Sequence, residues 1–230
     1  MTAATAGEDI IRVCRRLHAA GLIAGPDGNV SIRLAPDRIL VTPAGCSKVD
    51  LVPGDLVELD LAGRQLAGHR TASSEVRMHL RAYRRRADVQ AVVHAHPPTA
   101  TGFAVAGETL PIGVLPEIIL QVGWVPLLPY ATPGTDALPD SFEPYLDEHD
   151  AFLLANHGAT TLGATLTVAH QRMESLEHAA RILLAARQLG RVNALSAAQV
   201  EALVATRRAA SPGAPYPGCP VSAPLQMPHA

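Results

Sequence analysis

The 230-residue sequence is long enough for one large domain or two small ones, and its formal net charge of −2 gives no reason to expect a nucleic-acid partner. Aromatic residues make up only 3% of the chain, so we expect a core of aliphatic side chains. No apolar run approaches the ~20 residues of a membrane-spanning helix, and no signal peptide opens the sequence. The three cysteines lack metal or redox spacing, which fits a reducing compartment, so we expect a cytoplasmic protein without a membrane partner.

Helix and strand patterns alternate through the first 96 residues. Apolar residues at helical spacing indicate helices, and alternating or continuous apolar runs between turn residues indicate strands. The predicted elements are a helix over residues 9–18, strands over 30–34 and 38–43, a hairpin over 55–68, a helix over 73–86 and a buried strand over 89–96. The basic run Arg84–Arg86 is expected at the solvated end of the second helix.

The second half continues this mixed pattern. The predicted elements are strands over 125–130 and 151–156, a helix over 138–147 and a long helix over 166–189. Ser196 and Gln199 form a capping box that predicts the start of a last helix. Residues 211–230 are so rich in proline that we expect a flexible tail after a single domain of residues 1–210. Because the sequence lacks a strict β-α-β rhythm and a G-x-G-x-x-G turn, we expect an α/β domain with a mixed sheet.

The stretch VVHAHPPTATGF carries two histidines, His94 and His96, at the end of a predicted strand. Alternate strand residues point to the same face, so both imidazoles are expected side by side where Pro97 and Pro98 turn the chain out of the sheet. Two neutral imidazoles on one face make half of a metal site, although a buried strand can also carry a histidine for structural reasons.

Two further segments supply candidate partners. His157, in AFLLANHGATTLG, follows an apolar strand and precedes Gly158, at an edge of the sheet where active sites tend to open. Glu75, in TASSEVRMHL, lies in the first turn of a predicted helix, behind Ser73 and Ser74. Taken singly, Glu75 could favour the positive end of the helix and the serines could cap it. Together, three histidines and one carboxylate offer the donor set of a zinc-like cation.

The segments GNVSIR, VTPAG, SSE, HAHPPTATGFA, PYATPGT and LLANHG occur in the order and spacing of the class II aldolase/adducin family. The sequence resembles the branch that contains L-fuculose-1-phosphate aldolase, over about residues 8–190. This resemblance implies a three-layer αβα sandwich with a central mixed, mostly antiparallel sheet. It also implies a homotetramer whose active sites lie at subunit interfaces.

The resemblance implies roles for individual residues. His94, His96 and His157 match the metal ligands, and the expected ion is Zn²⁺ or another divalent metal such as Mn²⁺ or Co²⁺. Glu75 matches the carboxylate that closes the coordination and becomes acid/base when substrate displaces it. The residues that match the phosphate-binding segments are Gly28, Asn29, Gly45, Ser73 and Ser74. Glycine backbone and a serine-capped helix start also suit an anion on physical grounds.

The implied reaction is reversible cleavage of a ketose 1-phosphate, of the fuculose-1-phosphate or 5-deoxy-pentulose-1-phosphate type, to dihydroxyacetone phosphate and an aldehyde. A second acid must handle the proton on the aldehyde oxygen. Related aldolases use a tyrosine from a neighbouring subunit, but the nearest corresponding position here holds Glu117. Glu117, Tyr130 or Tyr216 could take this role, and Glu117 could equally be a plain helix-start residue.

Other polar residues receive structural interpretations. Ala44 stands where the family often has a hydroxyl, which predicts a weaker phosphate site or one helped by Lys48. We expect Lys48 to be an exposed loop residue instead, and His149 to pair with neighbouring acids at the surface. The histidines expected on helix surfaces or in the core are His79, His170 and His178.

Other activities occur on the same scaffold. A decarboxylase or dehydratase of a phosphorylated sugar or sugar acid is the alternative, because these enzymes share the metal and phosphate sites. The Asp-containing segment of the 4-epimerases is absent from the sequence. A non-catalytic adducin-like module is least favoured, because such a module dispenses with the metal ligands and usually carries long charged tails.

Overall fold

The computed structural model describes residues 2–210. The proline-rich segment 211–230, which includes Tyr216 and Cys219, lies outside the described residues, so the flexible tail and the domain boundary before it stay predictions. Within residues 2–210, none of the helices combines the length and the apolar character that crossing a membrane requires.

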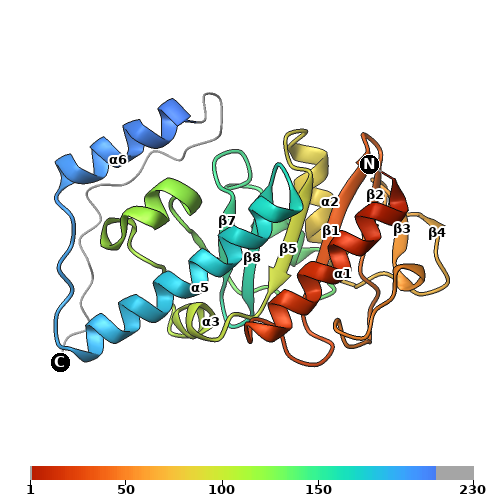
Figure 1. Cartoon of the computed structure of the whole chain (residues 1–230), viewed down its shortest axis with the longest axis horizontal. Helices are drawn as coiled ribbons and strands as arrows, with labels where there is room; N and C mark the ends of the chain where they lie inside the picture. Colours follow the sequence, from red (N-terminus) through yellow and green to blue (C-terminus); the bar gives the residue numbers. More distant parts are fainter. Residues whose placement is uncertain (1, 211–230) are drawn as a thin grey trace.

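One eight-stranded sheet forms the centre of the structure, with the strand order β4-β3-β2-β1-β5-β8-β7-β6 (Figure 1). The strands are β1 (Asn29–Ala35), β2 (Arg38–Val41), β3 (Val57–Asp60), β4 (Gln65–Ala67), β5 (Ala91–Ala95), β6 (Leu127–Leu128), β7 (Ala151–Leu154) and β8 (Gly158–Gly163). β6 and β7 pair in parallel, and the other six neighbouring pairs are antiparallel. The predicted mixed, mostly antiparallel sheet is therefore confirmed.

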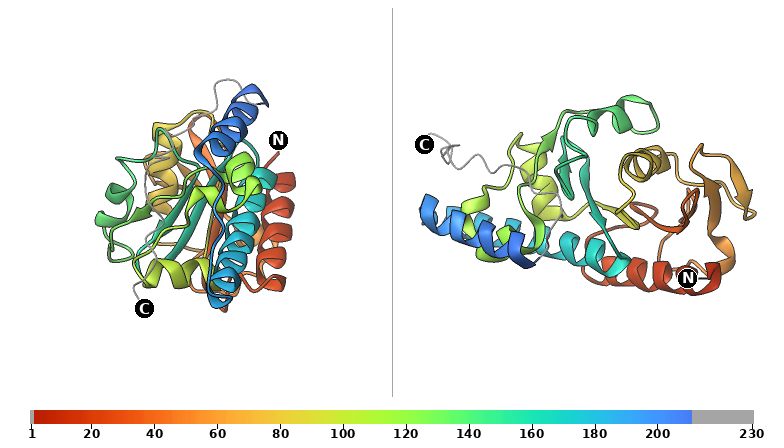
Figure 2. Two further views of the ribbon diagram at one scale, coloured as in Figure 1. Left: turned by 90° about the vertical axis from the view of Figure 1, so that its left-hand side faces the viewer. Right: turned by 90° about the horizontal axis from the view of Figure 1, so that it is seen from above.

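Helices cover both faces of this sheet and complete the three-layer αβα sandwich (Figure 2). They are α1 (Ala3–Ala19), α2 (Val76–Arg85), α3 (Pro98–Val105), α4 (Ala137–Ser141), α5 (Leu166–Gln188) and α6 (Ala197–Ala210), with short turns η1 (Pro53–Asp55), η2 (Ile112–Val114) and η3 (Ile118–Val122). Aliphatic side chains of α1, α3 and α5 pack on one face, whereas α2 and α4 pack on the other. The core is mainly aliphatic, as expected from the composition.

The last helix, α6, packs on η3 rather than on the sheet. Its capping box forms as predicted: the Ser196 N–H donates to Gln199 Oε1 at 2.8 Å, and the Gln199 N–H donates to Ser196 Oγ at 3.3 Å. Near its other end, the Arg207 guanidinium donates to the carbonyl oxygen of Ile119 at 2.9 Å. This contact fastens α6 to η3.

Two elements beside the histidine motif were not predicted. α3 begins directly after Pro97, and Glu177 of α5 caps it by accepting hydrogen bonds from the N–H groups of Thr99 and Ala100 at 2.9–3.2 Å. No local pattern reveals this cap, because it comes from a distant part of the chain. β8 has the sequence GATTLG, in which two glycines weaken the strand signal.

Several boundaries differ from the prediction. α2 begins at Val76 rather than Ser73, and Glu75 occupies the N-cap position without a side-chain cap, so the predicted serine cap is wrong. The predicted strand 125–130 shortens to β6 because two prolines flank Leu127 and Leu128. The predicted helix 138–147 is helical only as α4 and then continues as turns.

Two side chains expected in solvent are buried. Arg86 donates to Asp150 Oδ1 at 2.8 Å and to the carbonyl of His149 at 3.0 Å. His149 packs against the Trp124 ring with 4.9 Å between ring centroids, and burial lowers its pKa to about 4. The basic run is solvated at Arg84 and Arg85, as expected, but Arg86 is buried because it pairs with buried Asp150. The expectation of a surface His149 is wrong.

A buried polar chain crosses the layer between β1 and α2. His79 Nδ1 lies 2.7 Å from Ser31 Oγ, which lies 2.8 Å from the Tyr83 hydroxyl. All three residues are fully or almost fully buried, as expected for His79 from its helical position. Burial lowers the pKa of His79 to about 3, so its ring is neutral near pH 7.

Replacing this histidine should flatten the pH dependence of stability. Folded His79 takes up a proton near pH 3 and the unfolded residue near pH 6.5, so between these values the unfolded state binds more protons and the free energy of unfolding decreases as the pH is lowered. His79→Asn should remove about 1.4 kcal/mol per pH unit from this slope. Urea unfolding of metal-free protein between pH 4 and 6 measures the slope, with exposed His18→Asn as the control. Equal slopes in wild type and His79→Asn would contradict a neutral buried ring.

Candidate metal centre and active site

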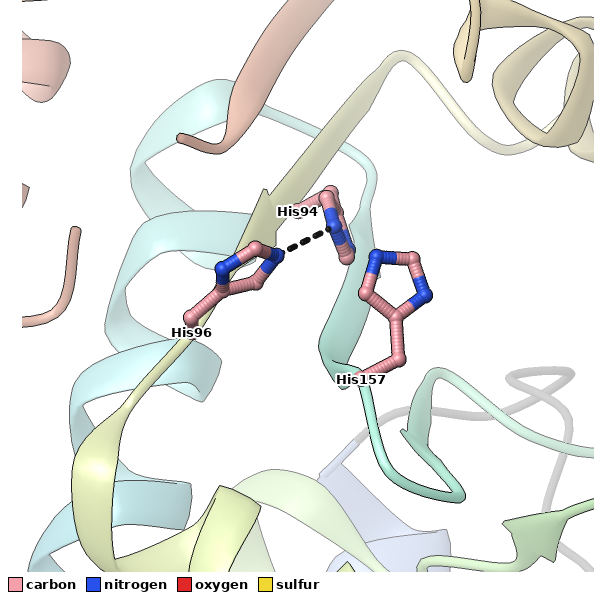
Figure 3. A group of neighbouring side chains, drawn as sticks. All are labelled: His94, His96 and His157. Carbon is pink, nitrogen blue, oxygen red and sulfur yellow. Dashed lines mark hydrogen bonds between the residues drawn. The ribbon is translucent and has the colours of Figure 1, made fainter. Parts of the chain in front are cut away.

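Three imidazoles converge at one end of the sheet (Figure 3). His94 is the penultimate residue of β5, His96 follows its end, and His157 lies in the turn between β7 and β8. Their ring centroids lie 4.9–5.2 Å apart, and one nitrogen of each ring lies within 4.8 Å of the others. The pairing of β5 with β8 explains the convergence, because it places Ala95 opposite Ala159.

The His94 ring is held in one tautomer. Its Nδ1 lies 2.9 Å from the carbonyl oxygen of Ala159, which can only accept, so Nδ1 carries the proton. Nε2 then presents a lone pair, 3.2 Å from Nε2 of His96. His94 is fully buried, and this burial lowers its pKa to about 3. The ring is therefore neutral near pH 7, as a metal ligand must be.

The turn that carries His157 explains the Asn-His-Gly sequence. Asn156 has φ = +56°, the left-handed conformation that Asn tolerates better than most residues, and it aims the next side chain at the site. A Cβ on Gly158 would lie 2.6 Å from both the carbonyl oxygen of Ala95 and Cδ2 of His96. Only glycine fits there, so the close approach of His157 to His96 depends on it.

Glu75 lies against the same histidines. Its Oε1 lies 2.9 Å from His157 Nε2 and its Oε2 lies 3.4 Å from His94 Nε2. Asn29 Nδ2 donates to Oε2 at 2.8 Å. Burial alone would raise the pKa of Glu75, but the hydrogen bonds from His157 and Asn29 help to outweigh it and hold the pKa well below its usual range. The carboxylate is therefore charged and turned toward the imidazoles.

This donor set fits a divalent metal ion. Three imidazole nitrogens and one carboxylate are typical ligands of zinc and similar cations. The site also leaves buried acceptors without partners in the described part of the chain, namely Asn29 Oδ1 and His157 Nδ1. The lone pair of His94 Nε2 lies 3.2 Å from His96 Nε2, so a proton on His96 can occupy this position when no metal is bound, and a cation would replace that proton.

The predicted phosphate-binding segments meet beside Glu75. Asn29 Nδ2 also lies 3.3 Å from Ser73 Oγ, which accepts from the Glu75 N–H at 3.4 Å. The Ser73 N–H donates to the carbonyl of Thr42 at 3.4 Å, which brings the 42–45 segment alongside. Gly28 has φ = +72°, and a Cβ there would lie 2.9 Å from the carbonyl oxygen of His94.

Gly45 and Ser74 complete this region. Gly45 has φ = +67° and open space around its Cα, so its backbone is accessible. Ser74 is exposed in the turn before α2, near Gly134. All five residues predicted to bind phosphate thus lie on three segments that are joined to one another by hydrogen bonds.

Lys48 does not lie where the sequence analysis placed it. Its side chain is buried, and Nζ donates to the carbonyl oxygens of Pro26 at 2.7 Å and Cys46 at 2.9 Å. The expectation of an exposed loop lysine is wrong, because the ammonium joins two of the phosphate-segment loops from inside.

The described candidates for the second acid, Glu117 and Tyr130, are both exposed. Glu117 is exposed immediately before η3, and it lines a groove with Gln121, Ser175 and His178 between η3 and α5. Tyr130 is 61% exposed. Tyr216 lies outside the described residues.

Two residues that sequence reasoning missed support His96. Asp27 Oδ2 lies 3.5 Å from His96 Nδ1, on the ring edge opposite the site. Glu177 fixes the start of α3, two residues after His96. Asp27 could have been found from its place beside Gly28, whereas the role of Glu177 depends on the packing of α5 against α3.

Comparison with known proteins agrees with this geometry. The family model described as "Class II Aldolase and Adducin N-terminal domain" matches residues 8–184. A 5-deoxy-D-ribulose 1-phosphate aldolase of Bacillus thuringiensis serovar kurstaki is 34% identical over 85% of this chain and 92% of its own. A 3-oxo-tetronate 4-phosphate decarboxylase of Escherichia coli K12 is 32% identical over 76% of this chain and 84% of its own. The solved structure of an L-fuculose 1-phosphate aldolase superposes with a TM-score of 0.83 and 30% identity, over 90% of this chain and 97% of that one.

Metal analysis tests the histidine cluster directly. We expect His96→Ala and His157→Ala each to lower the affinity for Zn²⁺ or Co²⁺ by at least 100-fold, because each removes one of three neutral nitrogen ligands. Isothermal titration of metal-free protein gives the affinity and the stoichiometry. His178→Ala, outside the cluster, should bind metal like wild type. One-to-one binding at wild-type affinity in both cluster variants would refute the site.

Proposed function

Because the chain belongs to the class II aldolase and adducin family, we propose that it is a metal-dependent aldolase that reversibly cleaves a ketose 1-phosphate to dihydroxyacetone phosphate and an aldehyde. The observation that carries this proposal is the position of Glu75. Its carboxylate contacts His94 and His157 on one side and Asn29, beside Ser73, on the other. Aldol cleavage requires a proton donor beside a carbon atom that lies close to the phosphate of the substrate. Glu75, between the histidines and the predicted phosphate segments, is in a suitable position for this role.

His94, His96 and His157 would hold the metal ion, for which Zn²⁺, Mn²⁺ or Co²⁺ is suitable. Such a cation, when bound, acts as a Lewis acid that polarises the carbonyl and hydroxyl oxygens of the ketose. The hydrogen bond from His94 Nδ1 to Ala159 orients that ring for this purpose. Gly28, Asn29, Gly45, Ser73 and Ser74 would bind the substrate phosphate.

Glu75 would carry the proton at C3 of dihydroxyacetone phosphate. In the cleavage direction the C4 hydroxyl passes its proton to the second acid/base residue as the C3–C4 bond breaks. Glu75, which takes up a proton from solvent once substrate has displaced it, delivers that proton to C3. In synthesis Glu75 removes that proton. Substrate that separates Glu75 from His157 removes the hydrogen bond that lowers its pKa, and the remaining burial then raises the pKa toward a useful range.

A Schiff-base route is disfavoured by this chain. Such aldolases need a lysine amine that can attack the ketose carbonyl. Lys48 is the only lysine of the 230 residues, and its Nζ is buried and bonded to two carbonyl oxygens. A metal-assisted route is therefore favoured.

The proposal also covers the second acid, the oligomeric state, the substrate and the cellular location. Glu117 or Tyr130 would reach the aldehyde oxygen of a neighbouring subunit in a homotetramer, since both side chains are exposed and available to a partner. The printed names of the relatives support a 5-deoxy-pentulose or fuculose 1-phosphate as substrate. Charged sugar phosphates are confined inside cells, and Cys14 and Cys46 are free thiols, which supports a cytoplasmic location.

The second candidate is a decarboxylase of a phosphorylated sugar acid. Relatives with this name are 32% identical, close to the value for the aldolases. A dehydratase would use the same sites, and a non-catalytic module is least favoured because this chain keeps all three histidines and Glu75 together.

A substrate panel separates these activities. We expect fuculose 1-phosphate or 5-deoxyribulose 1-phosphate to release dihydroxyacetone phosphate, and a chelator to abolish the release. A coupled dehydrogenase assay measures the product. Release of carbon dioxide from 3-oxo-tetronate 4-phosphate, with no ketose cleaved, would favour the decarboxylase.

The Glu75→Gln variant tests the acid/base role. The amide keeps the size of the side chain but cannot accept the C3 proton, so kcat/KM should fall at least 1,000-fold while three nitrogen ligands retain the metal. Proton exchange at C3 of dihydroxyacetone phosphate, followed by NMR in deuterium oxide, should also stop. Glu58→Gln, on β3, is the control and should remain active. Full turnover by Glu75→Gln would exclude this assignment.

A further inference from the structure

Lys48 is a buried ammonium without a carboxylate partner. Its side chain is 2% exposed, and no Asp or Glu oxygen among residues 2–210 lies within 4 Å of Nζ. Burial lowers its pKa, while the nearby thiols of Cys46 and Cys14 and the charges of Asp27 and Glu75 act in the opposite direction. Burying an unpaired ammonium is costly, so a protein rarely does it without a function.

The choice of lysine here is unusual within this sequence. The chain has 19 lysines and arginines in total, and Lys48 is the only lysine. An arginine would bring five donors in a flat fork, whereas the ammonium carries three. Two of these three bind the carbonyls of Pro26 and Cys46, which leaves one donor and the full positive charge.

The two carbonyls belong to the loops that carry Gly28 and Gly45. Both glycines have positive φ, and both match the family's phosphate segments. Lys48 is the only basic residue within the three segments 24–29, 42–48 and 71–75. The basic residues just outside are engaged elsewhere, Arg70 with Asp55 at 2.6 Å and Arg77 with Asp136 at 2.9 Å.

We propose that Lys48 supplies the positive charge of the phosphate site from behind its loops, holding the two glycine turns together and balancing the charge of the bound phosphate. The inference rests on the proposed function only in that the ligand is a phosphorylated sugar. Lys48 is thus a positioning and charge-balancing residue that selects phosphorylated over unphosphorylated substrates. It also takes over from the hydroxyl that Ala44 lacks.

Two variants distinguish the effect of the Lys48 charge from the effect of its hydrogen bonds to the two loops. Lys48→Gln keeps N–H donors for the two carbonyls but removes the charge, and Lys48→Met removes both. In aldol synthesis with one fixed aldehyde, Lys48→Gln should raise KM for dihydroxyacetone phosphate 10- to 100-fold with kcat within about threefold. Its kcat/KM with unphosphorylated dihydroxyacetone should equal that of wild type. Inorganic phosphate should inhibit it at least tenfold more weakly, and its zinc content should not change.

The control is Arg38→Gln, at the start of β2, which should keep the wild-type preference for phosphorylated substrate. An unchanged preference in Lys48→Gln, within twofold, would overturn the proposal. A parallel loss with both substrates would also overturn it, because that result means a bracing role alone.

A measurement on wild type covers the case in which the variants do not fold. Protein labelled with ¹³C at lysine Cε gives one signal, because Lys48 is the only lysine. Titration with inorganic phosphate should shift this signal in a saturable manner, and an unmoved signal at saturating phosphate would refute the proposal. A shift in a protein that cleaves no ketose 1-phosphate would sustain the phosphate site and reject the aldolase, so the two failures are distinguishable.

Discussion

The antiparallel contact between β5 and β8 is the constraint on which the site depends. Because Gly158 has no side chain, its Cα lies against the backbone of Ala95 and the ring of His96. The same contact gives His94 Nδ1 its acceptor, the carbonyl of Ala159, and so fixes the tautomer of a ring without access to solvent. Backbone geometry thus sets the direction and the protonation state of the His94 imidazole before any ligand is present.

The other neighbour of β5, strand β1, connects the histidine cluster with the predicted phosphate segments. β1 pairs with β5 so that Asn29 lies opposite His94, and its amide donates to Glu75. The loop before Asn29 carries Gly28 and Asp27, which contacts His96. One short segment therefore contacts His96, Glu75 and Ser73, so a change in one of these regions would affect the others.

Local patterns predicted a large part of this arrangement. The apolar run ending in His94, the capping box at Ser196 and the hairpin of β3 and β4 are local features, and the structure has each of them. Donor chemistry suggested His157 and Glu75 as partners of the histidine pair, and the resemblance to a family then implied a role for each. The capping of α3 by Glu177 was not predictable, because the donor and acceptor groups are distant in sequence.

The burial of charged side chains was the second feature that could not be predicted from the sequence. A lone lysine in a loop and a basic run at a helix end are usually solvated, and this expectation failed for Lys48 and Arg86, whose cations have partners inside the protein. Lys48 has two backbone carbonyls, and Arg86 has Asp150. Sequence alone does not reveal such partners, since they come from loops or turns that meet only after folding.

Because α6 packs on η3, the region around Glu117 can accept substitutions separately from the histidine cluster. Arg207 bonds to the carbonyl of Ile119, two residues after Glu117, so the C-terminal helix holds this segment in place. The histidines depend on β5, β8 and α3, whereas the buried apolar cluster of α6 contains Ile119 of η3 and, among the described residues, no member of those three elements. Substitutions along α6 can therefore move the groove around Glu117 and leave the imidazoles undisturbed. Such independence offers an evolutionary route by which one scaffold acquires new aldehyde partners while its cation-binding chemistry is inherited intact.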